Sequence, residues 1–190
     1  PEGWAVKTIK SIISRKPTPN KYKEKDVLEE GKVPVLDQST KECLGFHNGD
    51  VDFKATNDNP IVVFGDHSCK MTLMESDFSL AENMIPFSPK NHEILVHYLF
   101  YTIKGLAKTT EYKRHWGDLV IKEVFVAPQQ LQVEFGKIAK LNFEEIAILK
   151  KANGNLAQTR DKLLPRLISG KLSVENLDIN FPPSMEEALA

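Results

Sequence analysis

The feature that most constrains the fold is a change of sequence pattern near Pro128. Before this residue, short runs of apolar and β-branched residues are separated by Gly, Pro, Asn and Asp, which is typical of strands and turns. After it, no proline occurs between residues 129 and 164, and apolar residues recur at intervals of four and three. That spacing is typical of one face of a helix. The chain is therefore expected to join a β-rich domain to a long C-terminal helix.

The β-rich part predicts several strands and one helix. The strand segments are, in chain order, residues 32–37, 60–65, 79–87 and 119–126. The helix, over residues 92–103, would have an apolar face formed by Ile94, Leu95, Tyr98, Leu99 and Tyr101. These elements predict a mixed α/β (α+β) domain with a mainly antiparallel sheet.

The helix after Pro128 would be roughly 60 Å long if it were continuous. Its weakest point is Asn153–Gly154–Asn155, since Gly costs about 1 kcal/mol inside a helix. Either the helix breaks there or packing against another helix overrides that cost. Pro165 and Gly170 mark its predicted end.

One seam of residues runs along this helix at the four-then-three spacing. Its members are Leu131, Phe135, Ile138, Asn142, Leu149, Ala152, Leu156 and Leu163. Two further seam positions, Glu145 and Thr159, are polar, so the heptad pattern is imperfect. The pattern fits two arrangements: a helix folded back on its own domain, or a helix that pairs with a second helix. In the second arrangement, Asn142 would set the register.

Charge is unevenly distributed along the chain. The net charge is −1, yet residues 1–25 carry a net +5 and residues 104–114 a net +3, against −8 for residues 26–103. Concentrated basic segments suit a polyanionic ligand, although a solvated surface gives the same pattern. No apolar run is long enough for a membrane span, and no signal-peptide pattern opens the sequence, so a cytoplasmic protein is expected.

Four separate segments share motifs with one known protein family. Three of them are residues 3–9 (GWAVKTI), 31–39 (GKVPVLDQS) and 60–67 (PIVVFGDH). The most specific is residues 156–172 (LAQTRDKLLPRLISGKL). In these segments the chain resembles the specificity subunits of type I restriction–modification systems. The first is similar to the opening of that family's target-recognition domains, the next two to motifs of one large subgroup, and the last to the end of the family's spacer helix.

The resemblance implies a subunit that reads DNA and carries no catalytic residue or cofactor of its own. Family members have two recognition domains and two antiparallel spacer helices, whereas this chain has one of each. The pattern therefore predicts either a naturally short half-subunit, which forms a homodimer or pairs with another half, or half of a longer protein. The expected parts are a recognition domain (1–127), a dimerising spacer helix (128–177) and a C-terminal tail (178–190). The implied partners are double-stranded DNA, methyltransferase (modification) subunits and a restriction endonuclease subunit.

Two basic loops, 14–25 and 108–116, and a polar strip, 38–41, are the candidate DNA contacts. Prolines should keep the first loop out of regular structure. Cations can hold phosphates, and Arg, Lys, Gln and Asn can bond base edges. The candidates are Arg15, Lys16, Asn20, Lys21, Lys23, Gln38, Ser39, Lys41, Lys108, Tyr112, Lys113 and Arg114. Asn20, Gln38, Lys113 and Arg114 suit base reading best, and Trp116 is expected in the core.

Two other readings compete with DNA recognition: a helix-mediated interaction module without DNA contact, and a small hydrolase that uses His67. Asp66–His67–Ser68 has the residue types of a catalytic triad, but adjacent residues of an extended chain point in alternating directions. A turn is expected instead, with Asp66 accepting hydrogen bonds from nearby backbone N–H groups.

No metal or nucleotide site is expected either. Cys43, His47, His67 and Cys69 lack the spacing of a structural zinc site, and two cysteines are too few for a disulfide framework, so both should be reduced. The sequence has neither a Gly-rich phosphate loop nor a methyltransferase glycine motif. ATP and S-adenosylmethionine are therefore expected to bind to partner subunits.

Overall fold

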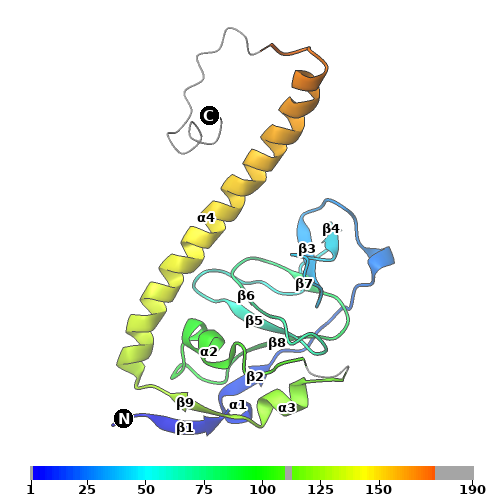
Figure 1. Cartoon of the computed structure of the whole chain (residues 1–190). Helices are drawn as coiled ribbons and strands as arrows, with labels where there is room; N and C mark the ends of the chain where they lie inside the picture. Colours follow the sequence, from blue (N-terminus) through cyan, green and yellow to red (C-terminus); the bar gives the residue numbers. More distant parts are fainter. Residues whose placement is uncertain (1, 110–112, 174–190) are drawn as a thin grey trace. The chain divides into compact units, whose positions relative to one another are not determined.

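A four-stranded antiparallel sheet organises the N-terminal part of the chain (Figure 1). In the computed structural model, which describes residues 2–109 and 113–173, its strands lie in the order β2 (Ile13–Arg15), β8 (Met84–Pro89), β5 (Ile61–Gly65) and β6 (Met71–Met74). All five residues of β5 are buried. This explains why β5 appears in the sequence as a continuous apolar run, since a strand covered on both faces needs no polar alternation.

A smaller sheet has the order β4 (Gly45–His47), β3 (Val33–Leu36) and β7 (Ser79–Leu80). Strand β3 pairs with β4 in antiparallel orientation and with β7 in parallel orientation. Residues of both sheets form one apolar cluster, whose buried members are Leu36, Phe53, Ala55, Ile61, Val63, Phe78, Leu80 and Met84. Full burial of each large apolar side chain contributes about 1.5–3 kcal/mol to stability, so this cluster fixes one sheet against the other.

A two-stranded ribbon and three short helices complete this part. Strand β1 (Ala5–Thr8) pairs with β9 (Glu123–Val126), and the helices are α1 (Ile9–Ile12), α2 (Val96–Ile103) and α3 (Trp116–Val120). The predicted strand 119–126 is wrong at its start, because Leu119 and Val120 belong to α3. Leu119 donates its N–H to the His115 carbonyl at 2.9 Å and is fully buried. Tertiary contacts therefore override its local β pattern.

Two other predicted elements have different first or last residues in the structure from those expected. Helix α2 begins at Val96 rather than at residue 92, and Leu95 precedes it in an extended conformation. The predicted strand 79–87 divides into β7 and β8, because Asn83 turns the chain with φ +62°. The strands expected at 32–37 and 60–65 are confirmed as β3 and β5. A mixed fold with mainly antiparallel sheets is likewise confirmed.

Helix α4 (Gln129–Ile168) is continuous for 40 residues and passes through Gly154 without a break. Pro165 does not mark its end but lies inside the last turn, and Gly170, with φ +68°, follows the helix. The expectation of a long C-terminal helix is thus confirmed. No helix in the described part of the chain is both long and apolar enough to cross a membrane.

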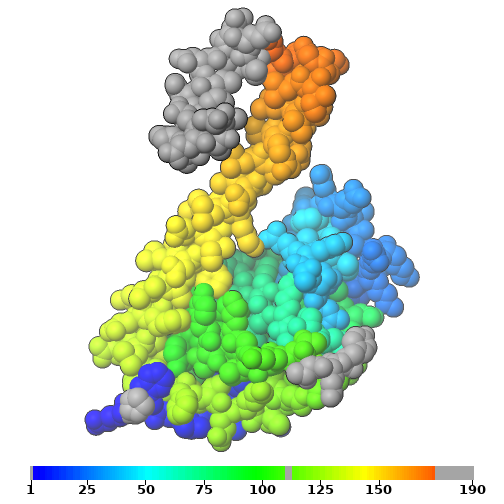
Figure 2. Space-filling view, viewed as in Figure 1, coloured from blue at the N-terminus to red at the C-terminus, as the bar shows by residue number. Residues whose placement is uncertain are grey.

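The chain forms two compact units, residues 1–142 and 143–190, and α4 contributes to both. Within the first unit, the start of α4 packs on α2. The ring of Phe135 meets Tyr98 at 6.1 Å and Tyr101 at 5.5 Å, both edge to face. In Figure 2 the green surface of α2 adjoins the yellow-green start of α4. Part of the helix is therefore folded onto its own domain.

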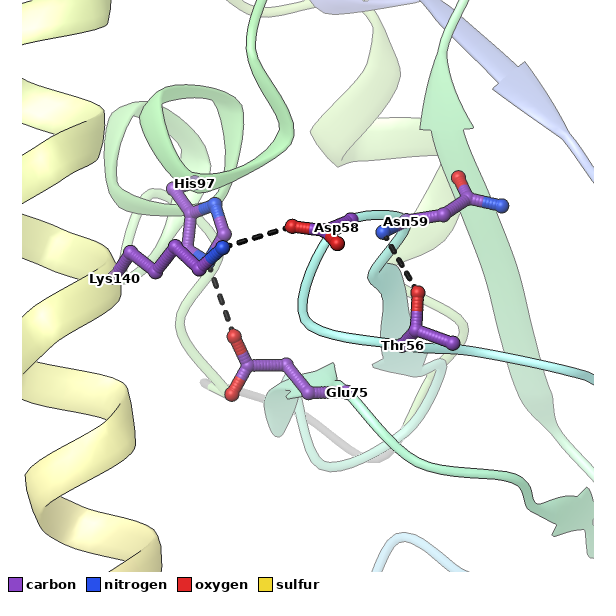
Figure 3. A network of polar contacts seen from close by, with 6 residues as sticks. All are labelled: Thr56, Asp58, Asn59, Glu75, His97 and Lys140. Carbon is purple, nitrogen blue, oxygen red and sulfur yellow. Dashed lines mark hydrogen bonds and ion pairs between the residues drawn. The ribbon is translucent and has the colours of Figure 1, made fainter.

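Polar contacts reinforce this packing. The Gln132 side chain is 2% exposed, donates Nε2–H to the Ala127 carbonyl at 2.8 Å and accepts the Leu95 N–H at 3.1 Å. Lys140 Nζ lies 2.8 Å from Asp58 Oδ1 (Figure 3) and lowers the pKa of the Asp58 carboxyl by this hydrogen bond. Figure 3 also shows the pair formed by His97 on α2 with Glu75, at 3.1 Å.

Candidate DNA-binding surface

A turn that follows the buried strand β5 holds the second basic loop in place. Asp66 Oδ1 accepts the Trp116 N–H at 2.8 Å, and the Asp66 carbonyl accepts the His115 N–H at 2.8 Å. His67 Nδ1 lies 3.1 Å from the Lys113 carbonyl oxygen. The turn predicted here, with Asp66 bonding backbone N–H groups, is therefore present, and its partners lie about fifty positions further along the chain.

Two cations of this loop, Lys113 and Arg114, lie in solvent, while the backbone of residues 113–116 is held by these hydrogen bonds. Arg114 is 76% exposed, with Nε 4.0 Å from Asp66 Oδ2. Lys113 forms a 3.1 Å pair with Asp118, and both side chains are about half exposed. An exposed pair such as Lys113–Asp118 contributes about 0–1 kcal/mol, so Lys113 can exchange Asp118 for a phosphate at little cost. The Asp66 side chain beside Arg114, by contrast, is only 10% exposed. The predicted core position of Trp116 agrees with its ring packing, 5.9 Å from Phe64 and 5.5 Å from Phe87.

Lys70 organises the polar strip 38–41, a role that the sequence analysis missed. Its Nζ donates to the carbonyl oxygens of Asp37, Ser39 and Lys41 at 3.2, 2.8 and 2.7 Å. An ammonium group that collects three carbonyls fixes the backbone of the whole strip. A lysine close after β5 in the sequence was the available signal, but nothing local indicates that its partners lie about thirty residues away.

The strip is also tied directly to the turn after β5. Gln38 Oε1 accepts the His67 N–H at 3.1 Å, and Ser39 Oγ donates to Asp37 Oδ1 at 2.8 Å. One acceptor site of the Gln38 amide is therefore engaged within the protein. Lys41 itself is exposed.

The first basic loop is more regular than predicted. Arg15 ends strand β2 opposite Phe87, and residues 24–26 form a short 3-10 helix. Prolines therefore exclude regular structure only between these two pieces. Arg15, Asn20, Lys21 and Lys23 are exposed, while Lys16 is partly buried. Two of these residues already have acidic partners: Asn20 Nδ2 donates to Asp52 Oδ1 at 2.6 Å, and Lys23 lies 3.7 Å from Glu82.

Tyr22 anchors this loop between those exposed residues. Its ring stacks on His47 at 4.5 Å, and its N–H donates to the Leu80 carbonyl at 3.0 Å. Burial, with the charge of Asp52 adding to it, raises the pKa of the Tyr22 hydroxyl. The hydroxyl therefore stays neutral at neutral pH.

Residues 80–83, from the end of β7 to the start of β8, link the three candidate segments, one directly and two through residues next to them or bonded to them. Tyr22 from the first loop bonds Leu80, Leu36 before the strip accepts the Ala81 N–H at 2.9 Å, and Asp66 donates its N–H to Asn83 at 2.9 Å. Since Asp66 also holds residues 115 and 116, one short connection links all three segments. The structure therefore brings together residues that the sequence separates by almost a hundred positions.

Lys108 lies in a separate hollow of about 400 Å³, which it lines together with Lys113, Asp118 and Lys122. Tyr112 lies outside the described residues, so its predicted role stays a prediction. Lys113 lines this hollow and also belongs to the segment that Asp66 and His67 contact, so the hollow adjoins that segment.

Two of the four residues with zinc-binding side chains, His47 and Cys43, have other contacts in the structure. His47 is buried, with Nε2 2.9 Å from Ser79 Oγ, and Cys43 packs against the apolar cluster. Burial, together with the nearby Glu42, raises the pKa of the Cys43 thiol, which disfavours the thiolate that binds metals. Within residues 2–109 and 113–173, no three His, Cys, Asp or Glu side chains gather as a metal site would require.

The comparisons with known proteins agree with this architecture. The type I restriction enzyme MjaIX specificity subunit of Methanocaldococcus jannaschii is 26% identical over 204 residues, covering 93% of this chain and 46% of that protein. This chain is similar to one half of a type I specificity subunit. The resemblance predicted from the sequence motifs is thereby confirmed. No protein-family model matches the chain.

A solved structure shares the fold. The crystal structure of the type I restriction–modification S subunit from M. genitalium superposes with a TM-score of 0.66 at 24% identity, over 87% of this chain and 46% of that one. The chain thus spans somewhat less than half the length of both relatives. The mixed domain and long helix of this chain therefore have the fold of somewhat less than half of that S subunit.

Proposed function

We propose that this chain recognises one half of a bipartite DNA target as a specificity subunit of a type I restriction–modification system. The observation that carries this proposal is that three polar segments, two of them rich in cations, are linked through residues 80–83 by backbone hydrogen bonds, with most of their described side chains exposed. A rigid backbone with exposed donors and cations suits both phosphate contacts and base-edge contacts.

The candidate residues would divide this work. The other lysines of the two loops and the strip, with Arg15, would hold phosphates, and Lys113 and Arg114 would reach guanine edges in the major groove. Gln38 and Asn20 each have one polar atom engaged within the protein, so they would read bases only through their remaining groups. Ser39 already donates its single hydroxyl hydrogen to Asp37, so beside Gln38 it would contact DNA only as an acceptor.

Helix α4 would supply the second half of the function. Its seam residues are exposed in the single chain, among them Ile138 at 62%, Leu149 at 54% and Leu156 at 67%. Pairing with a second α4 would cover them and place two recognition domains on one DNA molecule, so the favoured target is an interrupted palindrome. The assembly would act in the cytoplasm, beside the DNA. Methylation and cleavage would belong to docked modification and restriction subunits, and this chain would need no cofactor.

The test is binding of the chain to a random-sequence DNA duplex over a range of salt concentrations. Phosphate contacts predict an affinity that falls steeply with salt, with a logarithmic slope of about −0.9 for each phosphate neutralised. Lys21→Glu with Lys23→Glu should weaken binding and flatten the slope. Lys151→Glu with Lys162→Glu makes the same charge change on α4 and should have little effect. Salt-independent binding, or no binding at low salt, would contradict the proposal.

A further inference from the structure

The turn after β5 contacts two candidate base-reading segments at once. Towards the strip 38–41, the His67 N–H donates to Gln38 Oε1 at 3.1 Å. Towards the loop, Asp66 and His67 together contact the backbone of Lys113, His115 and Trp116 at distances of 2.8–3.1 Å. No other described feature of the surface joins these two segments so directly.

Asp66 is placed to hold this geometry. It is 7% exposed, its N–H is bonded to Asn83, and it follows a strand whose residues are all buried. A buried carboxylate is costly unless its oxygens have donors; here the Trp116 N–H supplies one donor, and the Arg114 guanidinium lies 4.0 Å away. The loop residues therefore stabilise the buried Asp66 carboxylate, and the carboxylate in turn holds the loop backbone in position.

A fixed position of residues 113–116 matters more for base contacts, which read the DNA sequence, than for phosphate contacts. A phosphate contact tolerates a mobile lysine, whereas a bidentate base contact needs the donor pair in a fixed position. Ordering a flexible segment on binding also lowers affinity, and a segment ordered beforehand avoids that loss. A support that fixes residues 113–116 should thus act on the cognate sequence more than on DNA in general.

We propose that Asp66, with His67, is a positioning residue for base recognition: the turn holds the Lys113–Trp116 segment and Gln38 in one fixed arrangement. This inference rests on the proposed function. Asp66 touches no base in this scheme and acts through the segment that it holds.

The experiment uses the full chain and a DNA duplex enriched from a randomised library by the unaltered protein, with a scrambled duplex of the same composition. Asp66→Ala removes the acceptor for the Trp116 N–H, whereas Asp66→Asn keeps a side-chain oxygen there. Asp66→Ala should bind the enriched duplex about tenfold more weakly, with little change on the scrambled duplex and an unchanged salt slope. Asp66→Asn should retain most of the preference. Asp58→Ala, which also removes one acidic side chain from the first unit, should behave as the unaltered chain.

A DNA-free measurement separates positioning from a general loss of fold. Hydrogen exchange at the His115 and Trp116 amides should accelerate in Asp66→Ala while the amides of β5 stay protected. If Asp66→Ala does not fold, His67→Ala decides the matter, because it removes the Lys113 contact at a position less buried than Asp66; a loss confined to the enriched duplex is expected.

The outcomes separate the two proposals. Equal losses on both duplexes, or unchanged binding in both Asp66→Ala and His67→Ala, would overturn the positioning role while leaving DNA recognition intact. Failure of the unaltered chain to bind either duplex at low salt would contradict the proposed function, and this inference with it.

Discussion

The two stretches of helix α4 have the same apolar spacing but different surroundings. In the first unit, Gln132 and Ala139 are 2% and 3% exposed against the domain, while in residues 143–168 no described residue is buried. The most deeply covered positions of the first stretch lie beside the seam. Within the seam, the ring of Phe135 packs on α2, whereas Leu131 is 45% exposed and Ile138 62%. The domain therefore covers mainly a neighbouring face, and most of the seam stays exposed in both stretches.

This difference teaches that periodicity identifies an apolar face without identifying what covers it. Of the two arrangements that the pattern allows, the start of α4 adopts the first, folded onto its own domain. Pairing of the exposed seam with a second helix stays a prediction. Changes made separately on the two faces can test this division.

The largest effect is expected from charges placed on the seam. Leu149→Asp with Leu156→Asp should abolish the self-association that we propose, because each apolar contact, worth about 1.5–3 kcal/mol, is lost twice in a two-fold dimer. Light scattering at tens of micromolar would measure the mass. Lys151→Asp with Gln158→Asp, two positions along the helix from each leucine, should leave the mass unchanged. An unaltered chain that is already a monomer would rule out the homodimer.

The next largest effect is expected on the covered face. Gln132→Ala removes two buried hydrogen bonds and leaves the Leu95 N–H and the Ala127 carbonyl unpaired, which should lower the free energy of unfolding of the first unit by about 2–4 kcal/mol. Urea unfolding would measure this loss. Gln130→Ala, at an exposed neighbouring position, should change stability by no more than about 0.5 kcal/mol. Equal effects would mean that α4 is not anchored through Gln132.

The third prediction tests whether the loop that contains Lys113 and Arg114 acts in DNA binding independently of both faces of α4. Lys113→Ala and Arg114→Ala should each weaken DNA binding without affecting self-association. A lost phosphate contact flattens the salt slope by about one unit on every sequence, whereas a lost base contact costs roughly 1–3 kcal/mol on the cognate duplex alone. Titrations of both variants against cognate and scrambled duplexes would distinguish the two. Unchanged affinity throughout would remove this loop from the surface and leave Arg15, Asn20 and Gln38 as the main candidates.

The smallest effect is expected from alanine substitutions at two glycines of α4, Gly154 and Gly136. Gly154 has nothing within 4 Å of an added Cβ, whereas a Cβ on Gly136 would lie 3.4 Å from Leu95 Cδ1. Gly154→Ala should therefore stabilise α4 by up to about 1 kcal/mol, and Gly136→Ala should gain less. Thermal melting followed by circular dichroism would show the difference. Destabilisation by Gly154→Ala would reveal a close neighbour at a position that the seam model leaves in solvent.

The sequence by itself determined the broad architecture and the family resemblance. Strong local signals produced these results: the proline-free heptad of α4, the continuous apolar run of β5, and motifs such as residues 156–172. The same local reasoning misplaced the start of α2 and assigned Leu119 to a strand, because there the burial of neighbouring side chains decides the conformation.

Only the tertiary structure decided how the recognition segments are held. Lys70 and Asp66 act on backbone groups that lie from about thirty to fifty positions away, and residues 80–83 connect three segments that share no local pattern. Hydrogen-bond partners at such distances depend on how the sheets pack, so spacing along the chain cannot reveal them. The sequence could therefore name the exposed cations, while the buried groups that position them became visible only in the fold.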